Sequence, residues 1–308
     1  MAGIHRILAI FYYKQPTMKH VIENQHLSVT VNELGGELTS IIRKSDGMQM
    51  LWQGDAEYWH GQSPILFPAI GNSANQTAHF FGKEYPMTKH GLIRTMQFAL
   101  REKNADSITL EVTDNESTRQ HYPYAFSFAV RYALNDNTLD VSFIVSGKDK
   151  LLPFHVGAHP AFNLPDFKET DDVHGFLKLD VSDYLLSDGL KPGGLRWKEG
   201  AFQFPLKNGM LELGNHTFDC DTILDTRGLA HTCELYNKEK KRIVKVTFDA
   251  PVLALWAPKK GCCPFVCIEP WWGCCDDYGF NDEFSKRHWI NTAHPGEKKT
   301  ISYSITIF

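Results

Sequence analysis

The sequence has no apolar run long enough to cross a membrane. The longest apolar run near the N-terminus, Ile7 to Tyr13, covers seven residues, whereas a membrane-spanning helix needs about 20. No small-residue cleavage site follows it, so a secretory signal peptide is not indicated. Basic blocks are also missing, because 32 Lys and Arg stand against 36 Asp and Glu, for a formal net charge of −4. We therefore expect neither a membrane nor a nucleic acid as a partner.

Cysteine spacing typical of zinc sites is missing too. Five of the seven cysteines lie in the segment CCPFVCIEPWWGCCDD at residues 262–277, in the patterns C-C-x3-C and C-x6-C-C. These patterns do not reproduce the C-x2-C pairs that hold tetrahedral zinc. Adjacent cysteines cannot bridge to each other without backbone strain. The sequence therefore predicts free thiols in a reducing cytoplasm and no metal site.

Helical periodicity is scarce, and no repeat, low-complexity tract or linker interrupts the chain. Alternation of apolar and polar residues dominates instead, and it predicts strands at 27–32, 37–44, 107–113, 126–134, 138–146, 242–249 and 300–307. Only two short helices are expected, at 55–61 and 281–289. This pattern predicts an all-β fold, a large antiparallel β-sandwich with a few short helices.

The first 17 residues show no clear period, and strand patterning begins directly after Met18. We expect residues 1–17 to be an N-terminal extension outside the fold. With 43% hydrophobic residues, 18–308 can bury a large core as one domain. Nothing in the sequence indicates an oligomeric state.

Four stretches place polar residues in apolar surroundings, each where a strand runs into a Pro/Gly turn: 63–76, 88–94, 152–165 and 264–277. In the third, His155 and His159 are four residues apart. HVGAH lacks the glutamate of a metalloprotease helix, and prolines flank it, so a zinc helix is not favoured. On a strand both imidazoles would share a face. Either histidine could equally be a structural residue at a strand end.

Glu269 ends an apolar strand and precedes Pro270, Trp271 and Trp272. Partial burial without a nearby cation would raise the pKa of its carboxyl group and make it a usable base. Tryptophans beside a carboxylate suit a sugar, whose C–H faces stack on aromatic rings while its hydroxyls seek charged acceptors. A strand-terminal glutamate with two core tryptophans would explain the stretch equally well.

Taken together, PILFPAIG, KHGLIR, GAHPAFN and CIEPWWG, in this order, resemble the aldose 1-epimerase (galactose mutarotase-like) family, in its LacX-like branch. The likeness runs from about Val21 to the C-terminus, and GAHPAFN and CIEPWWG are its most specific parts. The resemblance implies a β-supersandwich fold and an isomerase that interconverts the anomers of a hexose without metal or organic cofactor.

The resemblance also implies roles for three residues: His159 as general acid, Glu269 as general base, and His90 as a second histidine that holds the ring oxygen. Interconversion removes the proton of the C1 hydroxyl, protonates the ring oxygen, opens the C1–O5 bond and closes it on the other face. An imidazole suits this task because its unperturbed pKa is about 6.5. We expect the acid and the base to act from opposite sides of one sugar ring.

The chain departs from the family pattern at the sugar-contacting positions. Asn72 follows Gly71 where the family usually carries an arginine, which removes a fixed cationic fork. Asp221 is the best match to the sugar-binding aspartate, and Asp219 competes with it. His155, Trp271 and Trp272 are further substrate-binding candidates.

Two alternatives remain open at this point. A mutarotase of hexose 6-phosphates would need cations at the pocket mouth, for which Lys89, Arg94, Lys259 and Lys260 are candidates. A non-catalytic carbohydrate-binding protein could keep the same pocket without turnover.

Overall fold

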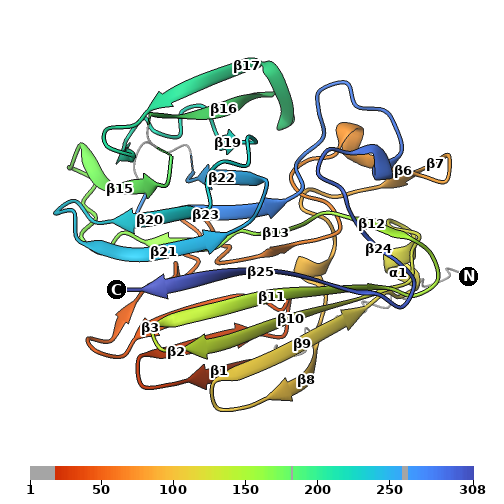
Figure 1. The fold of residues 1–308 in the computed structure, drawn as a ribbon, viewed down its shortest axis with the longest axis horizontal. Coiled ribbons are helices and arrows are strands. Elements are labelled where there is room, and N and C mark those ends of the chain that lie inside the picture. The colour runs from red at the N-terminus through yellow and green to blue at the C-terminus, as the bar shows by residue number, and fades with distance from the viewer. Residues whose placement is uncertain (1–17, 182, 259–262) are drawn as a thin grey trace, which may run out of the picture.

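The computed structural model describes residues 18–181, 183–258 and 263–308, which form antiparallel sheets stacked in layers (Figure 1). The predicted extension 1–17, Lys259 and Lys260 lie outside the described residues. No helix among the described residues is long and apolar enough to span a membrane.

The largest sheet has nine described strands and contains five of the seven predicted ones. Its order is β18 (Met210–Gly214), β15 (Val173–Leu179), β20 (Thr232–Tyr236), β21 (Arg242–Phe248), β25 (Lys298–Ile307), β11 (Thr138–Gly147), β10 (Phe126–Asn135), β9 (Ser107–Thr113) and β8 (Ala99–Lys103). The central hairpin pairs Phe126 with Gly147 and Asn135 with Thr138. The all-β prediction and these strand predictions are confirmed.

Two further sheets pack in the neighbouring layers. The four-stranded sheet holds β1 (Lys19–Glu23), β2 (Leu27–Asn32), β3 (Leu38–Arg43) and β4 (Met48–Gln49). The six-stranded sheet has the order β19 (Ile223–Asp225), β22 (Val252–Trp256), β23 (Phe265–Trp272), β13 (Val156–Ala158) and β5 (Ile65–Leu66), with β14 (Ala161–Asn163) also paired to β23. The predicted strands at 27–32 and 37–44 are thereby confirmed as β2 and β3.

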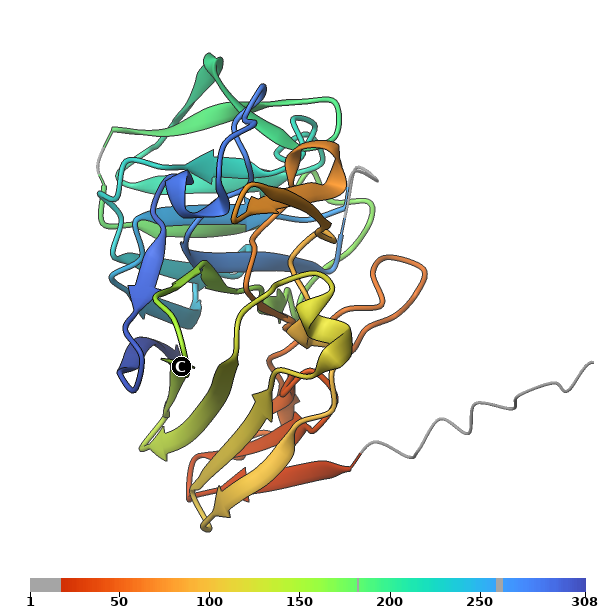
Figure 2. The same ribbon diagram turned by 90° about the vertical axis from the view of Figure 1, so that its right-hand side faces the viewer.

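Three two-stranded units complete the described strands. They are β12 (Leu152–Phe154) with β24 (Asn291–Ala293), β16 (Tyr184–Lys191) with β17 (Leu195–Pro205), and β6 (Thr77–Phe80) with β7 (Lys83–Pro86). Figure 1 shows the β16–β17 hairpin above β19 and β22. Seen from the side, β6–β7 lies next to the segment that follows β23 (Figure 2). There His79 and Glu283 form an isolated parallel β-bridge through their backbones.

Both helix predictions are wrong. Residues 56–58 form only a turn, because Tyr58 and Trp59 fold back onto Trp52, whose indole N–H donates to the Trp59 carbonyl at 2.7 Å. In 281–289 only η3 (Phe284–Lys286), a single 3₁₀ turn, is helical. The other described helices are also no longer than one turn: α1 (Glu116–Arg119), η1 (Ala74–Gln76) and η2 (Ile93–Thr95).

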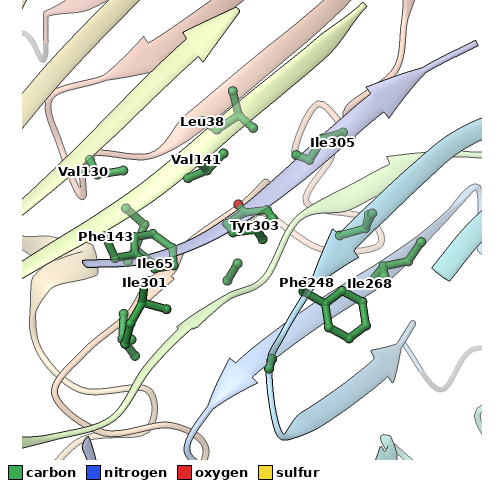
Figure 3. Close-up of a cluster of buried hydrophobic side chains, with 14 of the residues drawn as sticks. Leu38, Ile65, Val130, Val141, Phe143, Phe248, Ile268, Ile301, Tyr303 and Ile305 are labelled. Atoms are coloured by element: carbon green, nitrogen blue, oxygen red, sulfur yellow. The ribbon is translucent and has the colours of Figure 1, made fainter. Parts of the chain in front are cut away.

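The main core lies between the three large sheets. In Figure 3, Val130, Val141 and Tyr303 of the nine-stranded sheet lie in one buried cluster with Leu38 of the four-stranded sheet and Ile268 of the six-stranded sheet. Each fully buried aliphatic or aromatic side chain stabilises such a core by about 1.5–3 kcal/mol.

Strand β23 connects this core to the functional site. All eight of its residues are buried, and their side chains alternate between two faces. Val266, Ile268 and Trp272 belong to the main core, whereas Cys267 and Trp271 belong to two smaller clusters away from it. The strand does not end at Glu269, as we expected, but continues through Pro270 to Trp272. Glu269 therefore points away from the main core.

Candidate active site

A pocket of about 250 Å³ lies on the side of β23 that faces away from the main core, beneath the β16–β17 hairpin. Six of the eight predicted site residues line it: Asn72, His90, His159, Asp221, Glu269 and Trp271. They come from five separate segments of the chain, so the pocket exists only in the folded protein.

Glu269 lies where the neighbouring strand of β23 is interrupted. Strand β13 pairs with Trp271 and Trp272, and β14 pairs with residues 265–267. Between them, the turn at His159 and Pro160 faces Glu269, and Ile268 donates its N–H to the Pro160 carbonyl at 3.2 Å. Two residues on, Pro270 has no N–H to donate, which is tolerated because β13 leaves the ladder at this point.

His159 is enclosed by aromatic rings. Trp59 stacks on the imidazole at 4.9 Å between centroids, and Trp256 and His90 approach its edge at 5.7 and 5.6 Å. Only 8% of His159 is exposed. This packing restricts the imidazole to one orientation toward the pocket.

The His159 and Glu269 side chains meet directly. His159 Nε2 lies 3.3 Å from Glu269 Oε2, yet Glu269 Oε2 is buried without a hydrogen-bond partner. The two groups therefore lie side by side, because β23 and the 159–160 turn are neighbours in one sheet. This arrangement differs from the expected one, in which the acid and the base approach a sugar ring from opposite sides. Groups this close can reach two oxygens bonded to the same carbon, as O1 and O5 are in a hexose.

Burial shifts the pKa values of Glu269 and His159 in the directions that favour the neutral form of each side chain. It raises the pKa of Glu269 well above its usual range, against the opposing effects of the Lys89 charge and the Trp271 indole. Burial, together with the charges of Lys89 and Arg94, lowers the pKa of His159 to about 3. Burial thus favours a protonated Glu269 carboxyl group and a neutral His159 imidazole. Lys89 is a nearby cation that the sequence did not lead us to expect beside Glu269.

His90 is held in one tautomer by the backbone. The N–H of Gly71 donates to His90 Nδ1 at 3.1 Å, and the N–H of His90 donates to the Gly71 carbonyl at 2.9 Å. Burial lowers the pKa of His90 well below its usual value. A neutral His90 whose Nδ1 accepts carries its proton on Nε2, which makes it a donor for a substrate oxygen. Gly91 is required next to it, because a Cβ there would lie 2.2 Å from the Phe67 carbonyl oxygen.

Asn72 is positioned by a buried ion pair. Arg287 and Asp276 pair at 2.7 Å. Asp276 accepts from the Ala74 N–H at 2.8 Å, and Arg287 donates to Ser73 Oγ at 3.0 Å. Gly194, in the turn of the β16–β17 hairpin, lies close to the Asn72 side chain. A Cβ at position 194 would lie 2.6 Å from Asn72 Nδ2. The ion pair thus fixes the backbone that carries Asn72, and the hairpin limits the space of the Asn72 side-chain amide.

The two candidate aspartates lie in different places. Asp221 lines the pocket with a positive φ of 80°. Asp219 is exposed, pairs with His216 at 2.9 Å, and lines a separate small hollow. Of the two, only Asp221 can contact a ligand in this pocket.

Two predicted residues lie outside the pocket lining. His155 is buried below it, where its imidazole contacts Phe284 and its Nε2 lies 3.0 Å from the His288 carbonyl oxygen. It therefore does not share a pocket face with His159, as a continuous strand would require, because the chain leaves the strand at both residues. Trp272 points into the main core and donates to Asp249 at 3.0 Å.

The pocket also contains residues that the sequence did not suggest. Trp59 lies in the segment predicted to be helical, and Trp256 ends β22. Leu190 and Gly194 come from the β16–β17 hairpin. Tryptophan is a frequent sugar-contacting residue, but no local pattern distinguishes a pocket tryptophan from a core one.

Comparisons with known proteins agree with this fold. A family model described as aldose 1-epimerase matches residues 18–306. The plasmid-encoded protein LacX of Lactococcus lactis subsp. lactis is 31% identical over 93% of this chain and 98% of its own length. The structure of a galactose mutarotase related enzyme from Lactobacillus acidophilus superposes with a TM-score of 0.88 at 30% identity, covering 94% of this chain and 97% of that one. A galactose mutarotase-like protein from Lactobacillus casei superposes with a TM-score of 0.87 at 26% identity, over 94% of this chain and 100% of that one.

Proposed function

Because the chain belongs to the aldose 1-epimerase family, we propose that it is a mutarotase, an isomerase that interconverts the α and β anomers of a hexose. The observation that carries the proposal is the His159–Glu269 pair, with 3.3 Å between Nε2 and Oε2 inside one pocket. Cys233, Cys267, Cys274 and Cys275 are free thiols, which agrees with action in a reducing cytoplasm; that location stays a prediction.

The reaction uses the pair as follows. Glu269, as carboxylate, takes the proton of the O1 hydroxyl while protonated His159 gives a proton to O5. The C1–O5 bond breaks and a carbonyl forms at C1. Rotation about C1–C2 and the reverse proton transfers close the ring as the other anomer. The Nε2–H of His90 donates a hydrogen bond to the ring oxygen, and Asp221 and Asn72 accept and donate to other hydroxyls.

The electrostatics of the pocket support the ring-opened state. After ring opening Glu269 carries a proton and His159 is neutral. Burial favours this distribution, because it raises the pKa of Glu269 and lowers that of His159. The reactive carboxylate–imidazolium form arises when Glu269 passes its proton to His159, which separates two opposite charges at short range but leaves the net charge of the pair at zero. A properly placed acid or base contributes about 10²–10⁴ in rate.

Two cations at the pocket favour a second candidate substrate, a hexose 6-phosphate. Lys89 and Arg94 both line the pocket and are both exposed. In the described part of the chain neither forms an ion pair, so both are available to a phosphate group.

Polarimetry or proton NMR on freshly dissolved α-galactose, α-glucose and their 6-phosphates tests these proposals. We expect acceleration of mutarotation over buffer, reduced about 10²–10⁴-fold in Glu269→Gln and in His159→Ala. Binding without acceleration for any of these sugars would contradict the enzyme and leave a carbohydrate-binding protein.

A charge-matched comparison separates the two substrate classes. If the phosphorylated sugar is the substrate, Lys89→Ala/Arg94→Ala raises KM for the 6-phosphate more than for the free hexose. Lys83→Ala/Lys103→Ala, which removes the same charge from exposed strands outside the pocket, serves as the control. Equal KM changes for both sugars would favour the free hexose.

A further inference from the structure

Cys267 is a buried thiol beside the acid–base pair that the proposed reaction does not use. It lies two residues before Glu269 on β23, so both side chains leave the strand on the same side. One ligand atom each of His159, Cys267 and Glu269 lies within 4.8 Å of the others. Within 18–181, 183–258 and 263–308, no other group of three histidine, cysteine or acidic residues comes this close.

The three side chains supply a zinc-type donor set. Imidazole nitrogen, thiolate sulfur and carboxylate oxygen bind Zn²⁺ at about 2.0–2.3 Å, which places neighbouring ligand atoms of a tetrahedron about 3.3–3.8 Å apart. His159 Nε2 and Glu269 Oε2 are already at 3.3 Å, and the Cys267 sulfur lies within 4.8 Å of the ligand atoms of both residues. Glu269 Oε2 has no hydrogen-bond partner that a metal ion would have to displace.

Charge balance and access also fit a divalent cation. A thiolate and a carboxylate neutralise Zn²⁺, so the bound ion would carry no net charge into a site where Glu269 is 1% and Cys267 0% exposed. His159 and Glu269 line the pocket, which leaves the fourth coordination position open to water or a sugar hydroxyl.

We propose that His159, Cys267 and Glu269 form a binding site for Zn²⁺ or a similarly soft divalent cation, entered from the pocket, and that the bound ion blocks the acid–base pair. The inhibitory part rests on the proposed mutarotase function, whereas metal binding does not. On binding, the Cys267 thiol and the Glu269 carboxyl release their protons, so affinity increases with pH. The proposal departs from our expectation of no metal site, which considered the spacing of cysteines alone.

Cobalt substitution tests metal binding independently of activity. Co²⁺ titrated into the metal-free full-length protein is expected to give one equivalent of thiolate-to-cobalt charge-transfer absorption, which Zn²⁺ displaces and Mg²⁺ does not. Cys267→Ser and Cys267→Ala are expected to lose this absorption and to weaken Zn²⁺ binding at least tenfold. The rival site is the adjacent pair Cys274 and Cys275, whose sulfurs lie 3.8 Å apart. Cys274→Ser/Cys275→Ser should therefore retain the absorption.

Activity supplies the second measurement. Micromolar Zn²⁺ is expected to inhibit the wild type in competition with sugar, and Cys267→Ala should turn over sugar without metal while resisting Zn²⁺ at least tenfold. The metal site is refuted if no absorption develops, or if it survives Cys267→Ala and disappears in the Cys274/Cys275 variant. A cobalt site in a protein without mutarotase activity would overturn the proposed function but not the metal site.

Discussion

The Glu269 carboxyl group shows how the surroundings of one side chain determine its chemistry. It is enclosed by β23, the 159–160 turn and the Trp271 ring, and no hydrogen-bond donor satisfies its Oε2. The same enclosure keeps His159 and His90 neutral. An acid and a base with pKa values moved in opposite directions can exchange one proton without taking up another from solvent.

The first prediction concerns the pH dependence of the rate. The pair holds one proton between the lowered pKa of His159, about 3, and the raised pKa of Glu269. Activity is therefore lost on the acid side only near the former and on the alkaline side as Glu269 loses its proton. Between pH 5 and 8 we expect kcat/KM to show no transition centred at 6.5, the pKa of an unperturbed histidine. A decline with a midpoint at 6.5 that disappears in His159→Gln would contradict this assignment.

Strand β23 illustrates what a single element contributes. Successive side chains of β23 point to opposite faces of the sheet. Ile268 and Trp272 therefore lie in the main core, and Cys267, Glu269 and Trp271 lie on the pocket side. Two consecutive tryptophans therefore have different tasks, although the sequence alone presents them as a pair.

The second prediction compares these tryptophans by the same substitution. Trp271→Phe is expected to raise KM for the sugar about tenfold, because it removes ring area and the indole N–H beside Glu269. Trp272→Phe is expected to leave KM unchanged and to lower the free energy of unfolding by about 1 kcal/mol, because it removes the hydrogen bond to Asp249. Steady-state kinetics and urea denaturation of both variants make the comparison. Equal KM values in the two would show that Trp271 does not contact the substrate.

The third prediction concerns the β16–β17 hairpin, which covers the pocket. Gly193 and Gly194 both have positive φ, 92° and 70°, but only a Cβ on Gly194 would collide with Asn72. Substitution of either by alanine should cost about 1 kcal/mol of stability, because alanine disfavours this conformation. Gly194→Ala should in addition raise KM several-fold by displacing Asn72, whereas Gly193→Ala should not. If both variants change KM equally, Asn72 is not the residue through which the hairpin acts.

On the scale of the entire fold, the layers bury several histidines that an unfolded chain would expose. His155 lies below the pocket, where burial and the charge of Arg287 lower its pKa to about 3. His159 has a similarly lowered pKa. Such groups make the stability of the whole molecule depend on pH.

The fourth prediction follows from this dependence. Histidine in the unfolded chain has a pKa of about 6.5. Below that pH these histidines bind protons in the unfolded state, whereas in the folded state they stay neutral down to about pH 3. Their contribution to the free energy of unfolding is therefore fully present above pH 6.5 and is lost as the pH falls. His155→Gln keeps a donor for the His288 carbonyl and does not titrate. Denaturation at several pH values between 7.5 and 5 should show a smaller slope in this variant, by at most about 1.4 kcal/mol per pH unit. An unchanged slope would mean that His155 takes up its proton equally in the folded and unfolded states.

Local patterning in the sequence was sufficient for the strands and for the fold class. Alternation over six to ten residues depends only on which side chains need burial, and β2, β9, β10 and β11 begin where it predicts. The short helix at 55–61 failed because Trp59 gains more by packing on Trp52 and His159 than the segment gains by continuing as a helix. The division into a 17-residue extension and one domain stays a prediction.

Pairings between distant segments were decided by the tertiary structure. His159 and Glu269 were recognised singly through motifs, but their contact at 3.3 Å requires β13 and β14 to interrupt their pairing beside β23. The same interruption adds Cys267 to the pair, places Trp271 rather than Trp272 in the pocket, and leaves His155 below it. Sequence motifs report residue types and local spacing, whereas a reactive or metal-binding site depends on distances between segments that only the packed sheets define.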